Sequence, residues 1–308
     1  MKRVSIRSDL FRHFRGELRR NEPLAPRTSV RVGGAADLFA RPADAEDLRV
    51  LLAAAADGGV PVTVLGGGAN TIVADGGVEG VVVKLPAWSE EPTFDEGGGT
   101  FVFGAGEPIT KIAQAMKKHG LVGAEFLAGI PGTIGGATAM NAGTKNGETV
   151  RVVEAVEIAT PEGARWWARD ELVWRYRGCE LPRGGVVTRL RVRLRRPAGE
   201  AELQASRAAM EADLAYRRRT QPLHLPNSGS VFRNPPGDYA GRLIEACGLK
   251  GLRQGGAQIA EGHANWIVNL GGATGGDVSY LIEKARAEVR ARFGVELEPE
   301  VKRIGRWS

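Results

Sequence analysis

Three polar side chains in the sequence could do proton and charge chemistry. Ser230 follows a glycine in the segment GSVFRNP, Arg177 ends the segment VWRYR, and Glu300 lies within LEPEVKRIG. A guanidinium group can hold a carboxylate through two parallel hydrogen bonds. A serine hydroxyl can give up its proton where nearby cations favour the alkoxide, and a buried glutamate with a raised pKa can donate a hydrogen bond. We therefore treat these three residues as candidate catalytic residues.

Each of the three side chains also has an ordinary structural explanation. A serine after a glycine is commonly a cap or turn residue, and no Gly-x-Ser-x-Gly segment surrounds Ser230. Arg177 could be a surface residue at a strand end, as Arg175 could. A glutamate in a strand, such as Glu300, is often an exposed edge residue. A further polar cluster, His263-Ala264-Asn265, fits either a layer under the site or a satisfied structural histidine.

Two glycine-rich segments contain backbone that could approach a phosphate group closely. Residues 66–70 read GGGAN after an expected strand, and residues 129–143 read GIPGTIGGATAMNAG. N–H groups without a Cβ in the way suit a dinucleotide's diphosphate, and Asn70 and Asn141 could bond a ribose, a ribityl chain or a flavin ring. Neither segment is a G-x-G-x-x-G fingerprint or a P-loop, and tight turns remain the alternative for each. The candidate cofactor-binding residues are Gly66, Gly67, Gly68, Ala69, Asn70, Gly132, Thr133, Gly135, Gly136, Asn141 and Ala142.

The composition is that of an ordinary globular protein. The chain has 308 residues, of which 43% are hydrophobic and 25% charged, with a net charge of +6. The arginines of residues 189–195 alternate with leucine and valine, which predicts a half-buried strand with a solvated basic face rather than a nucleic-acid surface. A small dianionic ligand such as a diphosphate remains compatible with these arginines.

Cysteine, histidine and apolar patterns suggest the compartment. Cys179 and Cys247 alone do not support a secreted disulfide framework, and the four histidines lack metal-ligand spacing, so we expect a cytoplasmic protein without a metal site. We expect no membrane-spanning helix. The apolar residues of the N-terminal segment fall at helical spacing, which predicts a short docking helix rather than a signal peptide. They are Leu10, Phe11, Phe14 and Leu18.

Helical and strand patterns alternate along the chain, which indicates an α/β or α+β architecture. One helix is expected from the capping residue Asp44 through Ala56, and another begins after a capping box of Thr274 and Asp277 and ends at Gly294. The other expected helices cover residues 109–120 and about 200–220, and the expected strands cover 61–65, 81–85, 152–159 and 186–194. The final strand-like segment is expected to return to the first part of the chain.

Several long segments, taken in order, resemble the UDP-N-acetylenolpyruvoylglucosamine reductases. These flavoenzymes complete UDP-N-acetylmuramate for bacterial cell-wall synthesis. The resemblance runs from about residue 21 to residue 305. It is carried by NEPLAPRTSVRVGGAADLF, VLGGGANTIVAD, EFLAGIPGTIGGATAMNAG, VWRYRGCEL, QPLHLPNSGSVFRNPPGDYAGRLIEACGLKG, GGAQIAEGHANWIVN and ELEPEVKRIG.

The resemblance implies an α+β fold with a two-part FAD-binding domain of the vanillyl-alcohol-oxidase type and a smaller α/β substrate-binding domain. The first FAD-binding subdomain would cover residues 1–85, with the strand at 297–308 returning to it. The second would cover 86–215, giving an FAD-binding region of about 31–196, and the substrate-binding domain would cover 216–296. The chain is similar to the shorter form of the family, because no long insertion for a tyrosine loop separates Arg177 from Ser230.

The resemblance also implies roles for individual residues. The catalytic serine, arginine and glutamate of the family correspond to Ser230, Arg177 and Glu300. The implied substrate-binding residues are Tyr176, Arg177, Arg219, Gln221 and Asn234. Three positions depart from the family pattern: Ala69 and Cys179 stand where serine is usual, and Gln221 stands where the longer form has lysine. Diphosphate binding is therefore expected to depend on the arginines of residues 217–219.

By resemblance, the protein is expected to use FAD and NADPH to reduce an enolpyruvyl ether of a UDP-sugar. Hydride would pass from flavin N5 to the β-carbon, and Ser230 would protonate the α-carbon. The expected partner is this small molecule, with no nucleic acid or membrane, and the protein is expected to be a monomer. Two alternatives remain: an FAD-dependent oxidase on the same scaffold, and a non-catalytic regulatory protein that binds a nucleotide sugar or flavin.

Overall fold

The computed structural model describes residues 13–307, which form two compact units. The first unit contains residues 13–19, 39–67 and 80–216, and the second contains residues 20–38, 68–79 and 217–307. One sheet has the strand order β1-β2-β5-β3. Its strands are β1 (Glu17–Pro23), β2 (Ala35–Arg41), β5 (Val78–Val83) and β3 (Val62–Val64). The chain changes from one unit to the other within β1, β2 and β5.

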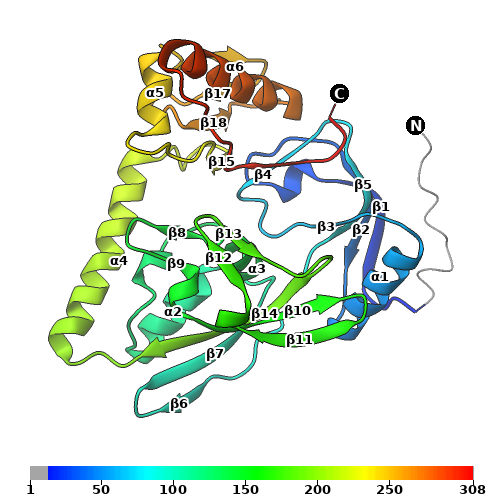
Figure 1. Cartoon of the computed structure of the whole chain (residues 1–308), viewed down its shortest axis with the longest axis vertical. Coiled ribbons are helices and arrows are strands. Elements are labelled where there is room, and N and C mark those ends of the chain that lie inside the picture. Colours follow the sequence, from blue (N-terminus) through cyan, green and yellow to red (C-terminus); the bar gives the residue numbers. More distant parts are fainter. Residues whose placement is uncertain (1–12, 308) are drawn as a thin grey trace. The chain divides into compact units, whose positions relative to one another are not determined.

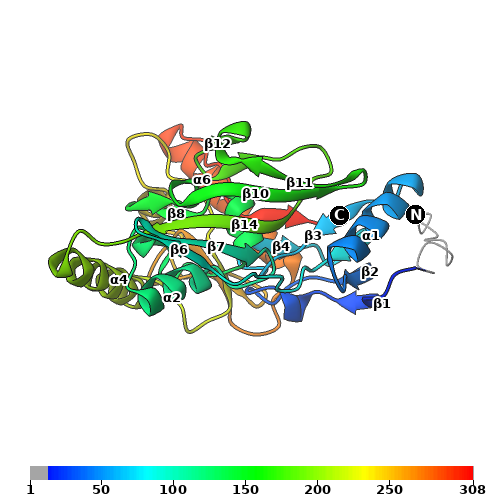
Figure 2. The ribbon, with the colours of Figure 1, turned by 90° about the horizontal axis from the view of Figure 1, so that it is seen from below.

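An antiparallel sheet of five strands forms the body of the first unit, with the order β11-β10-β14-β7-β6. Figures 1 and 2 show these strands side by side. They are β6 (Thr93–Asp95), β7 (Gly98–Gly104), β10 (Val153–Thr160), β11 (Gly163–Ala168) and β14 (Val186–Arg195). Along β14 the apolar residues are buried and the arginines are more exposed, so the predicted half-buried strand is confirmed.

Three of the four arginines of β14 have acidic partners. Arg189 binds Glu157 through two hydrogen bonds of 2.8 and 2.5 Å, and Arg193 lies 2.5 Å from Asp95. Arg195 pairs with Glu202. These pairs offset the basic face locally, which agrees with a solvated strand face rather than a polyanion-binding stripe.

Helices of the first unit follow the sequence patterns closely. Helix α1 (Ala45–Asp57) begins where the Asp44 carboxylate accepts the Asp47 N–H at 2.8 Å, as predicted. Helix α2 (Thr110–His119) ends at Gly120, whose φ of 63° is left-handed. The short helix α3 (Ile134–Ala139) packs on β14 and β7. The predicted strand β3 forms, but the expectation that it is buried is wrong, because Val64 is 46% exposed.

Helix α4 (Glu200–Thr220) has the predicted extent. Its apolar residues Leu203, Met210 and Leu214 form a stripe at helical spacing, and Ser206 is the residue of this helix that is buried. The stripe is only half-buried. Periodicity in the sequence indicates a helix, whereas burial depends on the surface that the fold places against it.

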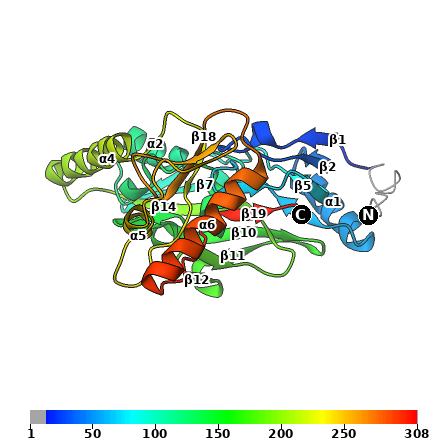
Figure 3. The same cartoon turned by 90° about the horizontal axis from the view of Figure 1, so that it is seen from above.

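The second unit combines a four-stranded antiparallel sheet with two helices. The sheet has the order β15-β18-β17-β16, and α5 and α6 pack together (Figure 3). Helix α6 also packs against β16 and β17. The elements are β15 (Asn227–Ser230), α5 (Ala240–Ala246), β16 (Arg253–Gln254), β17 (Ala257–Ile259), β18 (Trp266–Asn269) and α6 (Gly275–Phe293). The predicted capping box of Thr274 and Asp277 and the end at Gly294 are confirmed for α6. Val231, Phe232 and Leu281 lie in the core of this unit.

The two ends of the described chain were expected to form a helix at the N-terminal end and a strand at the C-terminal end. Strand β19 (Lys302–Ile304) pairs in parallel with β4 (Thr71–Val73) in the second unit. The predicted N-terminal helix is wrong at Leu18, which lies in β1, and its residues Leu10 and Phe11 lie outside the described residues. Of the helices within residues 13–307, none has the length and hydropathy needed to cross a membrane.

Candidate active site

The two glycine segments meet within the first unit. A Cβ on Gly66 would lie 2.6 Å from the Thr133 hydroxyl oxygen, and a Cβ on Gly67 would lie 2.8 Å from the Cα of Gly132. Distances below 3 Å leave no space for a side chain, so the backbones of the two segments are in direct contact. Thr133 precedes α3, and its hydroxyl accepts the Gly136 N–H at 3.4 Å. The two predicted loops therefore form one surface.

This surface presents backbone donors that the protein does not use. The N–H groups of Gly66, Gly67, Gly132 and Thr133 have no acceptor among residues 13–307. Thr133 is 8% exposed and the three glycines are half-buried. Partly buried N–H groups need acceptors, and a diphosphate supplies several oxygens at once. The geometry therefore fits the diphosphate of a dinucleotide such as FAD.

Arg177 lies at the tip of a hairpin in the first unit. Strands β12 (Val173–Arg175) and β13 (Gly178–Glu180) pair, and Tyr176 and Arg177 form the two-residue loop between them. Arg177 has a φ of 60°, in the left-handed region that side chains disfavour. Its Nη1 donates to the carbonyl oxygen of Gly143 at 2.9 Å. The arginine is thus held in a strained backbone conformation, which is frequent at functional sites.

Asn141 was predicted to contact the cofactor, and its amide group has contacts within the protein. The residue is 1% exposed. Its Nδ2 donates to Glu148 Oε2 and to the Arg175 carbonyl oxygen, each at 3.0 Å. Its Oδ1 accepts the Val150 N–H at 3.1 Å. Both amide hydrogens are therefore bonded within the protein. A contact between this side chain and the cofactor stays a prediction, and only the amide oxygen could make it.

Ser230 and Glu300 come together in the second unit. Ser230 ends β15, and the residue after it, Val231, accepts the Glu300 N–H through its carbonyl oxygen at 2.7 Å. Gly229 has a φ of 77°, which a glycine adopts without strain, and it lies within β15 where the pairing with β18 is irregular, so the expected tight turn before the serine is wrong. Asn70 donates from its side chain to the Glu300 carbonyl oxygen at 3.0 Å. The backbones that carry the serine and the glutamate are thereby tied together.

A buried asparagine fixes the segment after Ser230. Asn265 accepts the Phe232 N–H through its side-chain oxygen at 2.9 Å and donates to the Phe232 carbonyl oxygen at 2.8 Å. Its own carbonyl oxygen accepts the Val231 N–H at 2.8 Å. His263 Nδ1 accepts the Asn265 N–H at 3.3 Å, and burial lowers the pKa of His263. The cluster therefore contains a neutral, structural histidine beneath the serine segment.

Sequence reasoning missed two polar atoms beside Ser230. Ser228 Oγ and Trp266 Nε1 are buried and have no hydrogen-bond partner among residues 13–307. Trp266 pairs with Ser230 across β15 and β18. Buried polar atoms without partners are rare away from binding sites. No sequence pattern could reveal them, because the lack of a partner arises from packing.

The residues predicted to bind substrate have varied surroundings. Tyr176 is 57% exposed, and the Asn234 side chain accepts the Ala240 N–H at 3.1 Å at the start of α5. Gln221 has a buried Oε1 without a partner among residues 13–307, whereas Arg219 is exposed. Burial raises the pKa of Cys179 to about 11, so this thiol stays protonated and acts as a packing residue.

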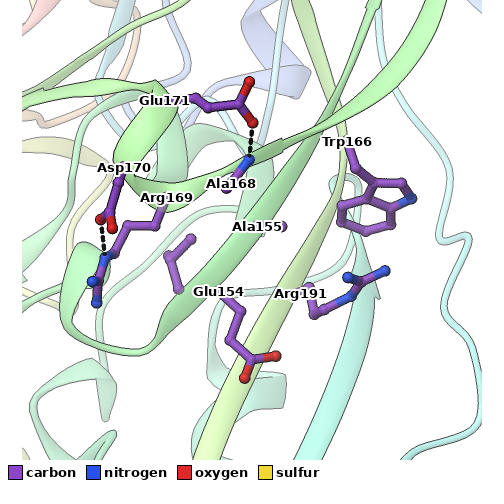
Figure 4. Close-up of a pocket in the computed structure, with 9 residues that line it drawn as sticks. Glu154, Ala155, Trp166, Ala168, Arg169, Asp170, Glu171 and Arg191 are labelled. Atoms are coloured by element: carbon purple, nitrogen blue, oxygen red, sulfur yellow. Dashed lines mark hydrogen bonds and ion pairs between the residues drawn. The ribbon is translucent and has the colours of Figure 1, made fainter.

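A surface pocket in the first unit is separate from all of the predicted residues. Its volume is about 600 Å³, and it lies where β10, β11 and β14 meet residues 168–171 (Figure 4). Arg191 lies over the Trp166 ring at 4.4 Å. The charged side chains that line the pocket have both signs and include Glu154 and Asp170. The pocket contains none of the glycine-segment, arginine, serine or glutamate residues, so we assign it no part in the reaction.

Comparison with known proteins first defines a class. Residues 36–169 match the family described as "FAD binding domain", which agrees with the donor surface of the glycine segments. This match makes the chain an FAD-binding protein.

The second match defines the family. Residues 221–304 match "UDP-N-acetylenolpyruvoylglucosamine reductase, C-terminal domain". Proteins named UDP-N-acetylenolpyruvoylglucosamine reductase are 55% identical over 94% of this chain and 93% of their own length in Myxococcus xanthus, and 54% identical over 98% and 90% in Anaeromyxobacter sp. strain K. The crystal structure of the Thermus caldophilus reductase is 37% identical, covers 94% of this chain and 99% of its own, and has a TM-score of 0.77. The chain belongs to the UDP-N-acetylenolpyruvoylglucosamine reductase family.

These matches confirm the predicted family and α+β fold class. An FAD-binding region is followed by the family's C-terminal domain, as expected. Within residues 13–307, no group of three or more metal-ligating side chains is present. The catalytic and binding roles of single residues stay predictions.

Proposed function

We propose that the protein reduces the enolpyruvyl ether of UDP-N-acetylglucosamine-enolpyruvate to UDP-N-acetylmuramate, with NADPH as the reductant and FAD as its cofactor. The observation that carries this proposal is the 55% identity to a named reductase over 94% of the chain. The unused N–H groups of Gly66, Gly67, Gly132 and Thr133 support it, because they suit the FAD diphosphate. When bound, FAD supplies the hydride that NADPH provides.

Charge stabilisation is the role we assign to Arg177 and Glu300. Hydride addition to the β-carbon of the enol ether leaves an electron pair at the α-carbon, conjugated with the substrate carboxylate. A guanidinium group at that carboxylate and a protonated glutamate beside it would lower the energy of this charge. Each such donor typically contributes about 3 to 4 kcal/mol to transition-state stabilisation.

Proton delivery is the role we assign to Ser230. Its hydroxyl gives a proton to the α-carbon, which completes the addition of one hydride and one proton across the double bond. The resulting alkoxide recovers a proton from water. A serine needs a nearby cation or N–H group for this step, because its hydroxyl is a poor acid in water.

The other residues of the site are assigned to binding. FAD binding is assigned to residues 66–70 and to Gly132, Thr133, Gly135, Gly136 and Ala142, and the substrate contacts are Tyr176, Arg177, Arg219, Gln221 and Asn234. In this proposal residues 1–85, with 297–308, and 86–215 form the two FAD-binding parts, and residues 216–296 bind the substrate. The protein acts as a cytoplasmic monomer on a small molecule.

A direct experiment tests the proposal. Purified protein that retains FAD is incubated with NADPH and the enolpyruvyl sugar nucleotide, and the sugar nucleotide is analysed by mass spectrometry. We expect consumption of NADPH that requires the sugar nucleotide, and a product carrying two more hydrogens. NADPH consumption that does not depend on the sugar nucleotide and is coupled to oxygen reduction would indicate an oxidase. Protein that contains no bound flavin would indicate a regulatory role.

A further inference from the structure

Two residues with left-handed backbones lie close to one another in the first unit. Asn141 has a φ of 42° and Arg177 a φ of 60°. A residue with a side chain pays roughly 1 to 2 kcal/mol for this conformation, although asparagine tolerates it better than most. Such a conformation persists only where the surrounding contacts determine it.

Hydrogen bonds between the segments that contain Asn141 and Arg177 hold both backbones in this conformation. Asn141 Nδ2 donates to the Arg175 carbonyl oxygen at 3.0 Å, on the strand that enters the Tyr176–Arg177 loop. Two residues after Asn141, the Gly143 carbonyl oxygen accepts from Arg177 Nη1 at 2.9 Å. The segment 141–143 therefore holds the hairpin at its backbone and at the arginine side chain.

Asn141 is itself fixed in place. The side chain is 1% exposed, and its remaining contacts are with Glu148 Oε2 at 3.0 Å and the Val150 N–H at 3.1 Å. Glu148 ends β9 (Gly147–Glu148), which pairs with β8 (Gly143–Thr144), and Val150 follows two residues later. An amide whose two hydrogens and oxygen are all bonded to rigid neighbours has one orientation.

We propose that Asn141 is a positioning residue that orients Arg177 towards the substrate carboxylate, rather than a ligand of the flavin. The inference rests on the proposed role of Arg177. The amide of Asn141 fixes the strand that enters the loop, and the carbonyl of Gly143 fixes the guanidinium. Loss of the amide lets the hairpin tip move, and a displacement of about 1 Å at a reacting group can slow a reaction about 100-fold.

The substitution Asn141→Gly tests this proposal. Glycine adopts a φ of 42° without strain, so the change removes the amide and leaves the backbone conformation available. We expect oxidation of the reduced flavin by the enolpyruvyl sugar nucleotide to slow about 10- to 100-fold. We expect flavin content, its visible spectrum and its reduction by NADPH to stay unchanged, and the amides of β12 and β13 to exchange hydrogen faster. The matched control is Asn21→Gly, at an exposed asparagine with a φ of 53°, which should change none of these.

A double-mutant cycle with Arg177→Ala separates positioning from other roles. If Asn141 acts through the arginine, the double variant oxidises no more slowly than Arg177→Ala alone. The proposal would be overturned if the two substitutions slowed oxidation by independent factors that multiply in the double variant. A loss of flavin, or equal slowing of flavin reduction by NADPH and flavin oxidation by the sugar nucleotide, would also overturn it. So would an Asn141→Gly variant with the original rates. Should this variant fail to fold, Asn141→Asp combined with Glu148→Gln replaces it, because the glutamine avoids two carboxylates 3.0 Å apart, while aspartate keeps the oxygen for Val150 but cannot donate to Arg175. The same outcomes apply.

The single variant Arg177→Ala distinguishes this inference from the proposed function. If Arg177→Ala leaves the oxidation rate unchanged, the proposed role of the arginine fails and the positioning role fails with it. If Arg177→Ala slows oxidation and Asn141→Gly does not, only the positioning role fails.

Discussion

At the residue scale, Arg177 combines a reactive role with a costly backbone conformation. Its φ of 60° disfavours any side chain, whereas glycine adopts it freely. We therefore expect Arg177→Gly to be more stable than Arg177→Ala by about 1 kcal/mol, because both variants lose the contact to Gly143 but only alanine keeps the backbone strain. Both variants should oxidise the reduced flavin with the sugar nucleotide about 100- to 1,000-fold more slowly.

Urea unfolding of the two variants and their anaerobic kinetics check this prediction. A higher stability for the alanine variant would show that the left-handed backbone carries no strain. An unchanged oxidation rate in both would show that the guanidinium has no role in the reaction.

Residue types in the motifs were predictable, but the partners of each amide within the protein were not. Asn70 and Asn141 stand in glycine-rich segments, which indicated contacts with a flavin. In the structure Asn70 bonds the Glu300 carbonyl and Asn141 bonds the Arg175 carbonyl. These partners lie 230 and 34 residues away in the sequence, so a local pattern does not reveal the contacts.

At the element scale, the contact of the two glycine segments is the feature on which FAD binding depends. A Cβ on Gly67 would lie 2.8 Å from Gly132 Cα, so Gly67→Ala must push the segments apart. We expect this change to lower the unfolding free energy by about 1 to 3 kcal/mol and to reduce the FAD retained after purification. The control is Gly199→Ala, where a Cβ meets no atom within 4 Å and should change neither quantity.

Absorbance of the bound flavin per protein molecule and urea unfolding measure both effects. Full retention of FAD by Gly67→Ala would contradict the assignment of these segments to the diphosphate.

Elements with strong local signals were predicted well, and those that depend on tertiary packing were not. The cap of Asp44, the capping box of α6 and the terminal glycines act within a few residues, so their sequence signals are sufficient. The exposure of Val64 and the half-buried stripe of α4 depend on which surface covers them. No local pattern records that surface.

At the scale of the whole molecule, the buried Glu157 and the half-buried His263 make stability depend on pH. Burial alone would raise the pKa of Glu157, but hydrogen bonds from Arg189 and Thr188 lower it below the usual 4.5. Burial lowers the pKa of His263 below 6.5. Both groups bind protons more readily in the unfolded chain, so stability falls as the pH falls below 6.5 for the histidine and below 4.5 for the glutamate.

Glu157→Gln tests the lower part of this dependence. We expect it to lower the unfolding free energy by about 2 kcal/mol near neutral pH, because the charged hydrogen bonds from Arg189 are lost. We also expect a shallower fall in stability below pH 4.5. Urea unfolding at several pH values in this range measures how steeply the unfolding free energy falls with pH. An equally steep fall in the variant would show that Glu157 does not cause this dependence.

The family could be predicted from the sequence because its motifs are long and extend over nearly the whole chain. The match of residues 221–304 includes the segment around Ser230. The buried atoms Ser228 Oγ and Trp266 Nε1 could not be predicted, because their lack of partners follows from how β15 and β18 pack.

Anaerobic stopped-flow spectroscopy of the wild-type protein and Ser230→Ala tests the central claim most directly. The flavin is first reduced with NADPH and then mixed with the enolpyruvyl sugar nucleotide, and its absorbance is followed in each step. We predict that both proteins are reduced at the same rate, while reoxidation of Ser230→Ala is about 100- to 10,000-fold slower than that of the wild type. Equal slowing of both steps, or no reoxidation of the wild-type flavin by the sugar nucleotide, would contradict this account.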